Sequence, residues 1–389
     1  MLNLQTHTEH FTNPLYLESG RILEPYDIAY ETYGEISDEK DNVIIVTHAL
    51  TGSHHAAGYY EGESKPGWWD GLIGPGKALD TDRYFIICTN VIGSCFGSSG
   101  PMSMMESHNA PYRYKFPVIT VKDMVKAQRI LFDRLGIHHV HAIVGGSMGG
   151  MQALQFAVHY PKFADKIIVM ASTYATQPWA IAFNKVAQEA ILEDPDFKKG
   201  YYDPEDIRKN GLTGMAVGRM AGHISFLSHH SMQRKFGRSY KRDDGLYELF
   251  GKFQVESYLE YNGYNFTKWF DPLSYLYITK AINIYDLGRG FDSLEEALSK
   301  IQAELYMISF SSDILFLPSE MERIVDVLKA RNYKKCDYLE VESDYGHDAF
   351  LVEIDKFEDY VREALKPKRR SLNPGPSRWH EEAITTPIR

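Results

Sequence analysis

A serine enclosed by glycines is the feature of the sequence that most directly suggests chemistry. Residues 145–149 are Gly-Gly-Ser-Met-Gly, with Ser147 at the centre, between the apolar run 139–146 and a segment with helical spacing. A G-x-S-x-G pattern between a buried strand and a helix is typical of a nucleophile elbow, a tight turn that lifts the serine hydroxyl above the edge of a sheet. This context favours a catalytic nucleophile over an incidental serine in a glycine-rich turn.

A serine hydroxyl is a weak nucleophile without a base, so a histidine and an acid should follow it along the chain. Asp313 comes just after the apolar run 303–312, and His347 lies in YGHDAF, between the last strand-like run and the last helical segment. Each residue alone could be a turn-capping aspartate or an ordinary loop histidine. Their order and their positions at strand ends predict a Ser147–Asp313–His347 triad.

Acyl transfer also requires donors for the oxyanion that forms on the attacked carbonyl. The expected donors are the backbone N–H of Met148, directly after the nucleophile, and that of Leu50, in the loop after the run 42–50. The same loop, HALTGSHHAAG, contains three histidines, at positions 48, 54 and 55. No carboxylate or cysteine stands at ligand spacing beside them, so no metal site is predicted.

The elements that would position these groups alternate between strands and helices. A segment with helical periodicity over 120–136 begins with a capping box at Thr120 and Asp123. Residues 21–34 suggest an antiparallel edge pair. Helical patterns replace strands over 173–300, and one amphipathic helix is expected over 349–365. Buried strands of a doubly wound α/β sheet are predicted at 42–50, 84–93, 139–146 and 166–172, and the strand pattern returns at 303–312 and 336–343.

Composition narrows the classes of partner. The 389 residues carry a net charge of −10, which argues against a surface for nucleic acid or anionic membrane. Three cysteines without a CxxC pair, and an N-terminus without a signal-peptide pattern, suggest a cytoplasmic protein. No uncharged run is suited to crossing a membrane. Residues 366–389 contain four prolines and a basic cluster, which predicts an extended or disordered tail.

Several long motifs resemble the homoserine O-acyltransferases of methionine biosynthesis, enzymes commonly called homoserine O-acetyltransferases. HALTGSHHAAG, GGSMGGMQAL and YGHDAFLVE are among them, and the resemblance runs from about residue 10 to residue 365. It implies an α/β-hydrolase fold with a mostly parallel eight-stranded sheet and an inserted helical lid. The core would comprise residues 1–172 and 301–365, the lid residues 173–300, and the tail residues 366–389. Phe226 and Asn262 stand where tyrosine and glutamine are expected in many relatives.

The resemblance also implies a reaction: transfer of an acetyl group from acetyl-CoA to L-homoserine through acyl-Ser147, by a homodimer without a permanently bound cofactor. Arg219 in the lid and Asp348 beside the histidine would contact homoserine. Their chemistry agrees, because an amino acid needs a cation for its carboxylate and a carboxylate for its ammonium. A solvated helix arginine and a helix N-cap are the alternative interpretations of these two residues.

Three other functions remain open from the sequence. The same fold supports an esterase, in which water resolves the acyl-serine. Within the family, succinyl-CoA could be the donor or serine the acceptor. A third possibility is a ligand-binding module without catalysis, which an intact triad argues against.

Overall fold

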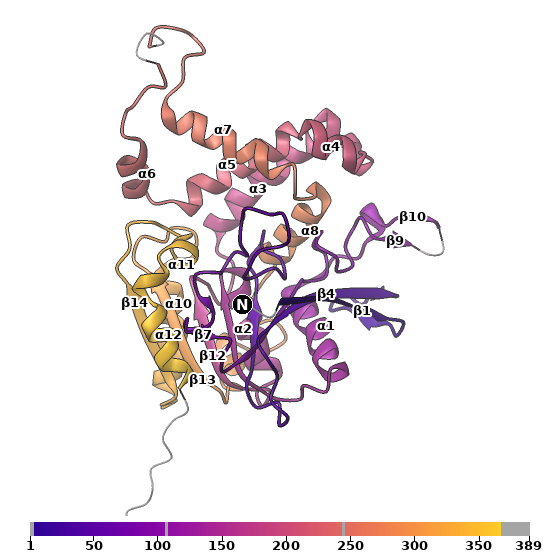
Figure 1. Cartoon of the computed structure of the whole chain (residues 1–389), viewed down its shortest axis with the longest axis vertical. Helices are drawn as coiled ribbons and strands as arrows, with labels where there is room; N and C mark the ends of the chain where they lie inside the picture. The colour runs from indigo at the N-terminus through magenta and orange to yellow at the C-terminus, as the bar shows by residue number, and fades with distance from the viewer. Residues whose placement is uncertain (1–3, 106–107, 243–245, 367–389) are drawn as a thin grey trace, which may run out of the picture.

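A computed structural model of the chain describes residues 4–105, 108–242 and 246–366, and its centre is one eight-stranded sheet (Figure 1). β4 pairs antiparallel with both of its neighbours, β1 and β8, and every other pair of adjacent strands in the sheet is parallel. In spatial order the strands are β1 (Leu4–Phe11), β4 (Tyr26–Tyr33), β8 (Phe85–Thr89), β5 (Val43–Thr47), β11 (Val140–Gly146), β12 (Ala164–Met170), β13 (Glu304–Phe310) and β14 (Cys336–Val341).

Both faces of the sheet are buried, which explains why its central strands are apolar throughout. In β5, Val43 and Ile45 enter one core cluster, and Ile44 and Val46 enter the other. This alternation follows from the two-residue period of a strand. Helices α1 (Val121–Arg134), α2 (Met148–His159) and α10 (Pro318–Ala330) cover the first face; α12 (Glu358–Leu365) and the loop segment that follows β5 cover the second.

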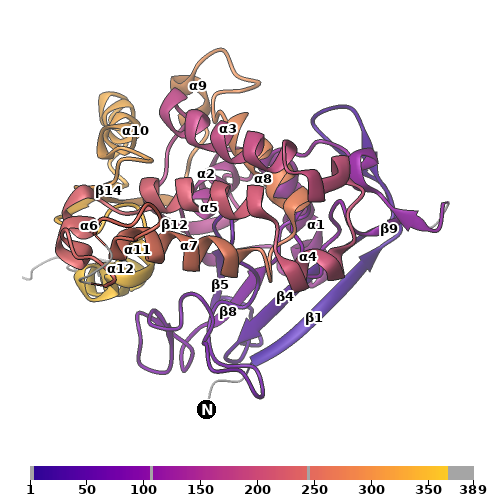
Figure 2. The ribbon, with the colours of Figure 1, turned by 90° about the horizontal axis from the view of Figure 1, so that it is seen from above.

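Between β12 and β13 the chain leaves the sheet and forms a layer of helices above the carboxyl ends of its strands (Figure 1). Seen from above, α5 lies between α3 and α7 (Figure 2). The helices in this region are α3 (Pro178–Leu192), α4 (Pro204–Asn210), α5 (Thr213–Phe226), α6 (His229–Phe236), α7 (Gln254–Phe266), α8 (Pro272–Asn283) and α9 (Leu294–Leu298). The division into core and lid at residues 173 and 300 remains our interpretation.

Short elements complete the described chain. They are the strands β2 (Leu15–Tyr16), β3 (Ile22–Leu23), β6 (Ile73–Gly74), β7 (Leu79–Asp80), β9 (Met104–Met105) and β10 (Ala110–Pro111), the 3-10 turns η1 (Arg113–Lys115), η2 (Pro195–Gly200) and η3 (Ile354–Lys356), and helix α11 (Ala349–Val352). In the described part of the chain, no helix is long and apolar enough to cross a membrane. The predicted tail, apart from Lys366, lies outside the described residues.

The predicted fold class is confirmed: the sheet has eight strands and is mostly parallel, and a strand is present in each of the six predicted runs. The capping box of α1 is also present, because Thr120 accepts from the Asp123 N–H while the Asp123 carboxylate accepts from the N–H of Thr120.

The prediction for residues 21–34 was wrong in one respect. β4 is antiparallel but interior, because it pairs with β8 on one side and with β1 on the other. The edge strand is β1, from Leu4 paired with Tyr33 to Phe11 paired with Tyr26. β1 was missed because an edge strand has few buried positions, so its residues carry little apolar alternation.

The single helix predicted over 349–365 was also wrong. The segment is divided into α11, the 3-10 turn η3 and α12, and Glu353 and Phe357 have non-helical backbone angles at the two breaks. The indole N–H of Trp69 donates to the carbonyl oxygen of Phe350 at 2.9 Å. In a continuous helix that oxygen would accept from the N–H of Ile354. A long-range contact therefore replaces a helical hydrogen bond.

Candidate active site

Ser147 occupies a strained turn between β11 and α2. Its backbone angles are φ 57° and ψ −124°, a conformation that is costly for a residue with a side chain. A Cβ atom on Gly145 would lie 2.2 Å from Thr47 Oγ1, and one on Gly149 would lie 2.0 Å from the carbonyl oxygen of Thr47. Glycine is thus required on both sides of the serine, because the turn lies against strand β5.

The structure brings together the three residues predicted to form a triad. His347 Nε2 lies 2.9 Å from Ser147 Oγ, and His347 Nδ1 lies 2.7 Å from Asp313 Oδ2. Ser147 follows β11, Asp313 follows β13 and His347 follows β14, so the parallel strands deliver all three to the same edge of the sheet. The arrangement can pass the serine proton to the imidazole.

The orientation of the Asp313 carboxylate is fixed by hydrogen bonds from the backbone. Its Oδ1 accepts the backbone N–H groups of Leu315 at 2.8 Å and Phe316 at 3.0 Å, which leaves Oδ2 directed at the imidazole. The side chains of His347 and Asp313 are only 4% and 1% exposed. An acid held in this way selects the tautomer in which Nδ1 carries the proton and Nε2 faces the serine.

The environment of His347 favours its protonated form. Burial alone would lower the pKa of the imidazole, but the charge and hydrogen bond of Asp313, with a further contribution from Asp348, outweigh burial and raise it above the ordinary value. The rings of Phe316 and Phe350 lie edge-on to the imidazole, with centroids 5.2 and 5.7 Å away. These rings shield the proton-transfer site from water.

The two expected oxyanion donors lie beside Ser147. Leu50 lines the same cavity as Ser147, in the loop after β5, and Met148 is the first residue of α2. The Met148 side chain is packed in the core, so only its N–H can serve the site. Across the described ranges, neither N–H donates to a protein acceptor. Both are available to stabilise a developing negative charge.

Arg219 and Asp348 both line the cavity next to the triad. The cavity has a volume of about 100 Å³ and is lined by both residues together with Ser147 and His347. The guanidinium lies between the rings of Phe226 and Phe266, 5.2 and 4.6 Å from their centroids. Considering residues 4–105, 108–242 and 246–366, neither charged group makes a hydrogen bond or an ion pair through its side chain.

Both members of this pair are partly buried, and the pKa of each is shifted by partial removal from water. Burial lowers the pKa of Arg219, against the attraction of Asp348. Burial likewise raises the pKa of Asp348, against the attraction of His347 and Arg219. Asp348 stands at the N-cap position of α11, but its carboxylate caps nothing, while its backbone N–H donates to the Phe226 carbonyl at 3.2 Å. A ligand that carries both an anionic and a cationic group could form an ion pair with each of these two side chains.

Two parts of the site were not predicted from the sequence. Phe226 lies two helical turns after Arg219, so its place beside the guanidinium could have been inferred from spacing; Phe266 comes from α7 and could not. The loop histidines 54 and 55 lie against the buried carboxylate of Glu31, which is 23 and 24 positions away from them in the sequence. No group of three or more potential metal ligands is found in the parts of the chain that the structure describes.

Comparison with known proteins places these features in context. A family model described as the alpha/beta hydrolase fold matches residues 42–354. A homoserine O-acetyltransferase from Sulfurimonas autotrophica is 74% identical over 364 residues, which are 94% of this chain and 99% of that protein.

Two solved structures show the same similarity at lower identity. The homoserine O-acetyltransferase from Bacillus anthracis superposes with a TM-score of 0.88 at 31% identity, covering 94% of this chain and 99% of that one. The esterase named E22 has a TM-score of 0.84 at 27% identity, covering 93% of this chain and all of that one.

Proposed function

The chain belongs to the α/β-hydrolase-fold family and, within it, to the homoserine O-acetyltransferases, and on that premise we propose how it acts. It transfers the acetyl group of acetyl-CoA to the hydroxyl of L-homoserine, giving O-acetyl-L-homoserine and free CoA. The observation that carries the proposal is that one cavity holds a serine hydrogen-bonded to a histidine together with an unpaired arginine and an unpaired carboxylate.

In the first half-reaction, His347 Nε2 accepts the proton of Ser147 as Oγ attacks the thioester carbonyl. The N–H groups of Leu50 and Met148 donate to the oxyanion. The carbon–sulfur bond then breaks, the histidine returns the proton to the departing CoA sulfur, and an acetyl ester remains on Ser147.

In the second half-reaction, the homoserine hydroxyl gives its proton to His347 and attacks the acetyl ester. The ester bond to Ser147 breaks, and the histidine returns the proton to the serine. Arg219 binds the homoserine carboxylate as a two-pronged donor, and Asp348 binds its ammonium, which orients the hydroxyl toward the ester. The protein's own side chains and backbone N–H groups supply every catalytic group in these two half-reactions, so we propose no permanently bound cofactor.

The acetyl donor is preferred over succinyl because of the cations available. Arg219 is the only lysine or arginine among the described residues that line the cavity, and homoserine would use it. A succinyl group would bring a second carboxylate. Arg234 does not line the cavity and pairs instead with Asp344 at the surface.

Hydrolysis of the acetyl-enzyme is the second candidate activity, favoured by the similarity to an esterase. One experiment separates the possibilities: acetyl-CoA or succinyl-CoA is paired with homoserine, serine or water alone, and the initial rates are compared. We expect acetyl-CoA with homoserine to be fastest, with parallel double-reciprocal lines. Intersecting lines without an acetyl-enzyme in the intact mass would contradict the two-step mechanism.

We further propose a homodimer in the cytoplasm that serves methionine biosynthesis, following the family resemblance. Large apolar side chains exposed in the lid region support self-association, namely Tyr247, Leu249, Phe250 and Tyr261. Light scattering of the purified chain would test the dimer.

A further inference from the structure

The turn that carries the Leu50 N–H is anchored on one side by His48. The turn is closed by the Gly52 N–H, which donates to the Ala49 carbonyl at 3.0 Å. His48 Nδ1–H donates to the same carbonyl at 2.8 Å, and its Nε2 accepts the Val91 N–H at 3.1 Å. Burial lowers the pKa of His48 to about 4, so this neutral tautomer is maintained.

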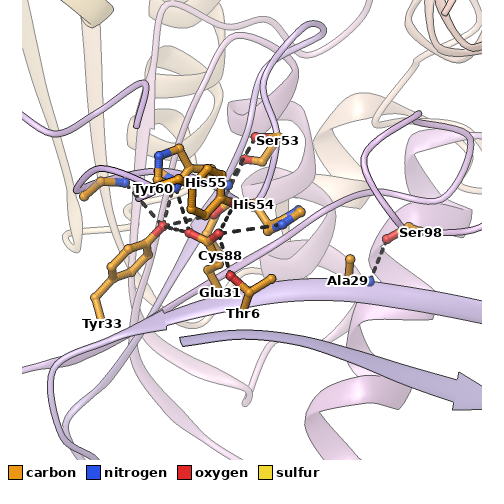
Figure 3. Close-up of polar contacts among 12 residues, drawn as sticks. Thr6, Ala29, Glu31, Tyr33, Ser53, His54, His55, Tyr60, Cys88 and Ser98 are labelled. Atoms are coloured by element: carbon orange, nitrogen blue, oxygen red, sulfur yellow. Dashed lines mark hydrogen bonds and ion pairs between the residues drawn. The ribbon is translucent and has the colours of Figure 1, made fainter. Parts of the chain in front are cut away.

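On the other side the loop wraps around one buried carboxylate, that of Glu31 on β4, which is fully buried (Figure 3). Both oxygens accept from two donors each. The donors are Tyr33 Oη at 2.6 Å and His55 Nδ1 at 3.0 Å to Oε2, and Thr6 Oγ1 at 3.0 Å and the Tyr60 hydroxyl to Oε1. Two of the four donors, His55 and Tyr60, belong to the loop itself, and their rings stack with centroids 3.9 Å apart.

Tyr33 connects Glu31 to the backbone of the loop through hydrogen bonds. Its hydroxyl accepts the N–H groups of Ala56 at 2.7 Å and Ala57 at 3.2 Å. A phenol oxygen has one proton and two lone pairs. Because the proton is donated to Glu31, both lone pairs are directed at the two amides, and the orientation of this hydroxyl is determined by the carboxylate.

The network requires the ionised form of Glu31. Burial by itself would raise the pKa of the carboxyl, but hydrogen bonds from His55, Tyr33 and Tyr60 outweigh it and hold the pKa below its ordinary value. An amide in place of the carboxylate would replace one acceptor oxygen with an N–H₂ donor. On the Oε1 side, the Thr6 and Tyr60 hydroxyls could accept from that donor only by turning their protons away from Glu31, and on the Oε2 side it would face His55 Nδ1–H and the Tyr33 hydroxyl. Tyr33 could not accept from it, because its lone pairs are already used.

We propose that Glu31 is a positioning residue for acyl transfer: it holds residues 53–60, and through them the turn that directs the Leu50 N–H at the oxyanion. The inference rests on the proposed function and extends it to a residue that does not line the cavity. A single oxyanion donor contributes about 10²–10³ in kcat. If the turn is held less firmly, part of this contribution to kcat should be lost in both half-reactions, because both pass through an oxyanion.

The test compares Glu31→Gln with Asp123→Asn. Asp123, on α1, is a similarly buried carboxylate that accepts the N–H groups of Glu18 and of the N-cap residue Thr120, and it does not line the cavity. Single-turnover acetylation by acetyl-CoA and by p-nitrophenyl acetate is measured, with deacetylation by homoserine, the KM for homoserine and the melting temperature. We expect Glu31→Gln to slow both half-reactions about 10- to 100-fold, a fraction of a full oxyanion donor, with the KM for homoserine unchanged. Asp123→Asn should lower the melting temperature and leave the rates of both half-reactions and the KM for homoserine unchanged.

Three results would overturn the inference: normal rates in Glu31→Gln, an increase confined to the KM for homoserine, or an equal loss of rate in Asp123→Asn. Tyr33→Phe removes one hydroxyl and should show the same pattern to a smaller degree, so it serves if Glu31→Gln does not fold. If the unmodified chain is acetylated by p-nitrophenyl acetate but not by acetyl-CoA, the proposed donor is wrong, while the comparison of variants still tests Glu31.

Discussion

The triad and the Arg219–Asp348 pair share one cavity but are held in opposite ways. Asp313 is fixed by two backbone N–H groups and a histidine, and His347 contacts both the acid and the serine. The Arg219 guanidinium lies over the rings of Phe226 and Phe266, and within the described chain neither it nor the Asp348 carboxylate makes a hydrogen bond or an ion pair. The reacting groups are therefore complete without substrate, whereas the recognition groups are not.

This difference has a physical basis. Groups that act in a transition state are most effective when no reorganisation is needed at the moment of reaction. Charged groups that recognise a ligand contribute most to its binding free energy when the ligand is their only ion-pair partner, since a buried charge without a partner is costly. The comparison predicts that changes in the triad abolish acylation, while changes in the pair spare acylation and impair transfer.

Ser147→Ala should have the largest effect, because it removes the atom that carries the acetyl group. We expect kcat to fall about 10⁶-fold and no acetyl-enzyme to form. Intact mass after incubation with acetyl-CoA checks the second point. Acetylation elsewhere with retained turnover would assign the nucleophile to another residue.

Asp313→Asn should reduce kcat about 10⁴-fold, because the amide stabilises the wrong tautomer of the histidine. The binding of homoserine to the variant, measured by calorimetry, should be unchanged, since Asp313 does not line the cavity. A loss of binding equal to the loss of rate would remove the distinction between the two groups.

Arg219→Ala and Asp348→Ala should lower kcat/KM for homoserine roughly 30- to several-thousand-fold, the usual cost of leaving one desolvated charge unpaired. Single-turnover acetylation by acetyl-CoA should remain near normal. Arg219→Lys should restore little, because an ammonium cannot reproduce the two-pronged guanidinium.

Arg234→Ala is the matched control for these variants, since Arg234 lies in the lid region but is 67% exposed and paired with Asp344. It should leave both half-reactions unchanged. If Arg219→Ala fails to acetylate yet binds homoserine normally, Arg219 serves the CoA side of the cavity instead.

The pH dependence should show the smallest effect. His347 must be neutral to accept a proton, and its pKa is raised by Asp313 and Asp348 despite burial. The rate should thus be lost as pH falls through an apparent pKa above the unperturbed value of about 6.5. A profile of kcat/KM between pH 5 and 9 checks this; a midpoint below that value would contradict the raised pKa.

The sequence by itself determined the alternating fold and the order of the triad. Apolar runs and helical spacing are local patterns, and the ends of parallel strands meet at one edge, so Ser147, Asp313 and His347 could be placed together from their positions alone. The turn at Ser147 could also be predicted, because its glycines form a local sequence pattern, although the contacts that require them come from Thr47 on β5.

Only the tertiary structure decided the features that depend on distant partners. Trp69 divides the last helical segment through a hydrogen bond across 281 positions, and Phe266 reaches Arg219 from another helix. Glu31 collects donors from β1, β4 and the loop after β5. Periodicity reports which face of an element is buried, but it carries no information about which distant polar group will meet a given donor, because that pairing is fixed by packing.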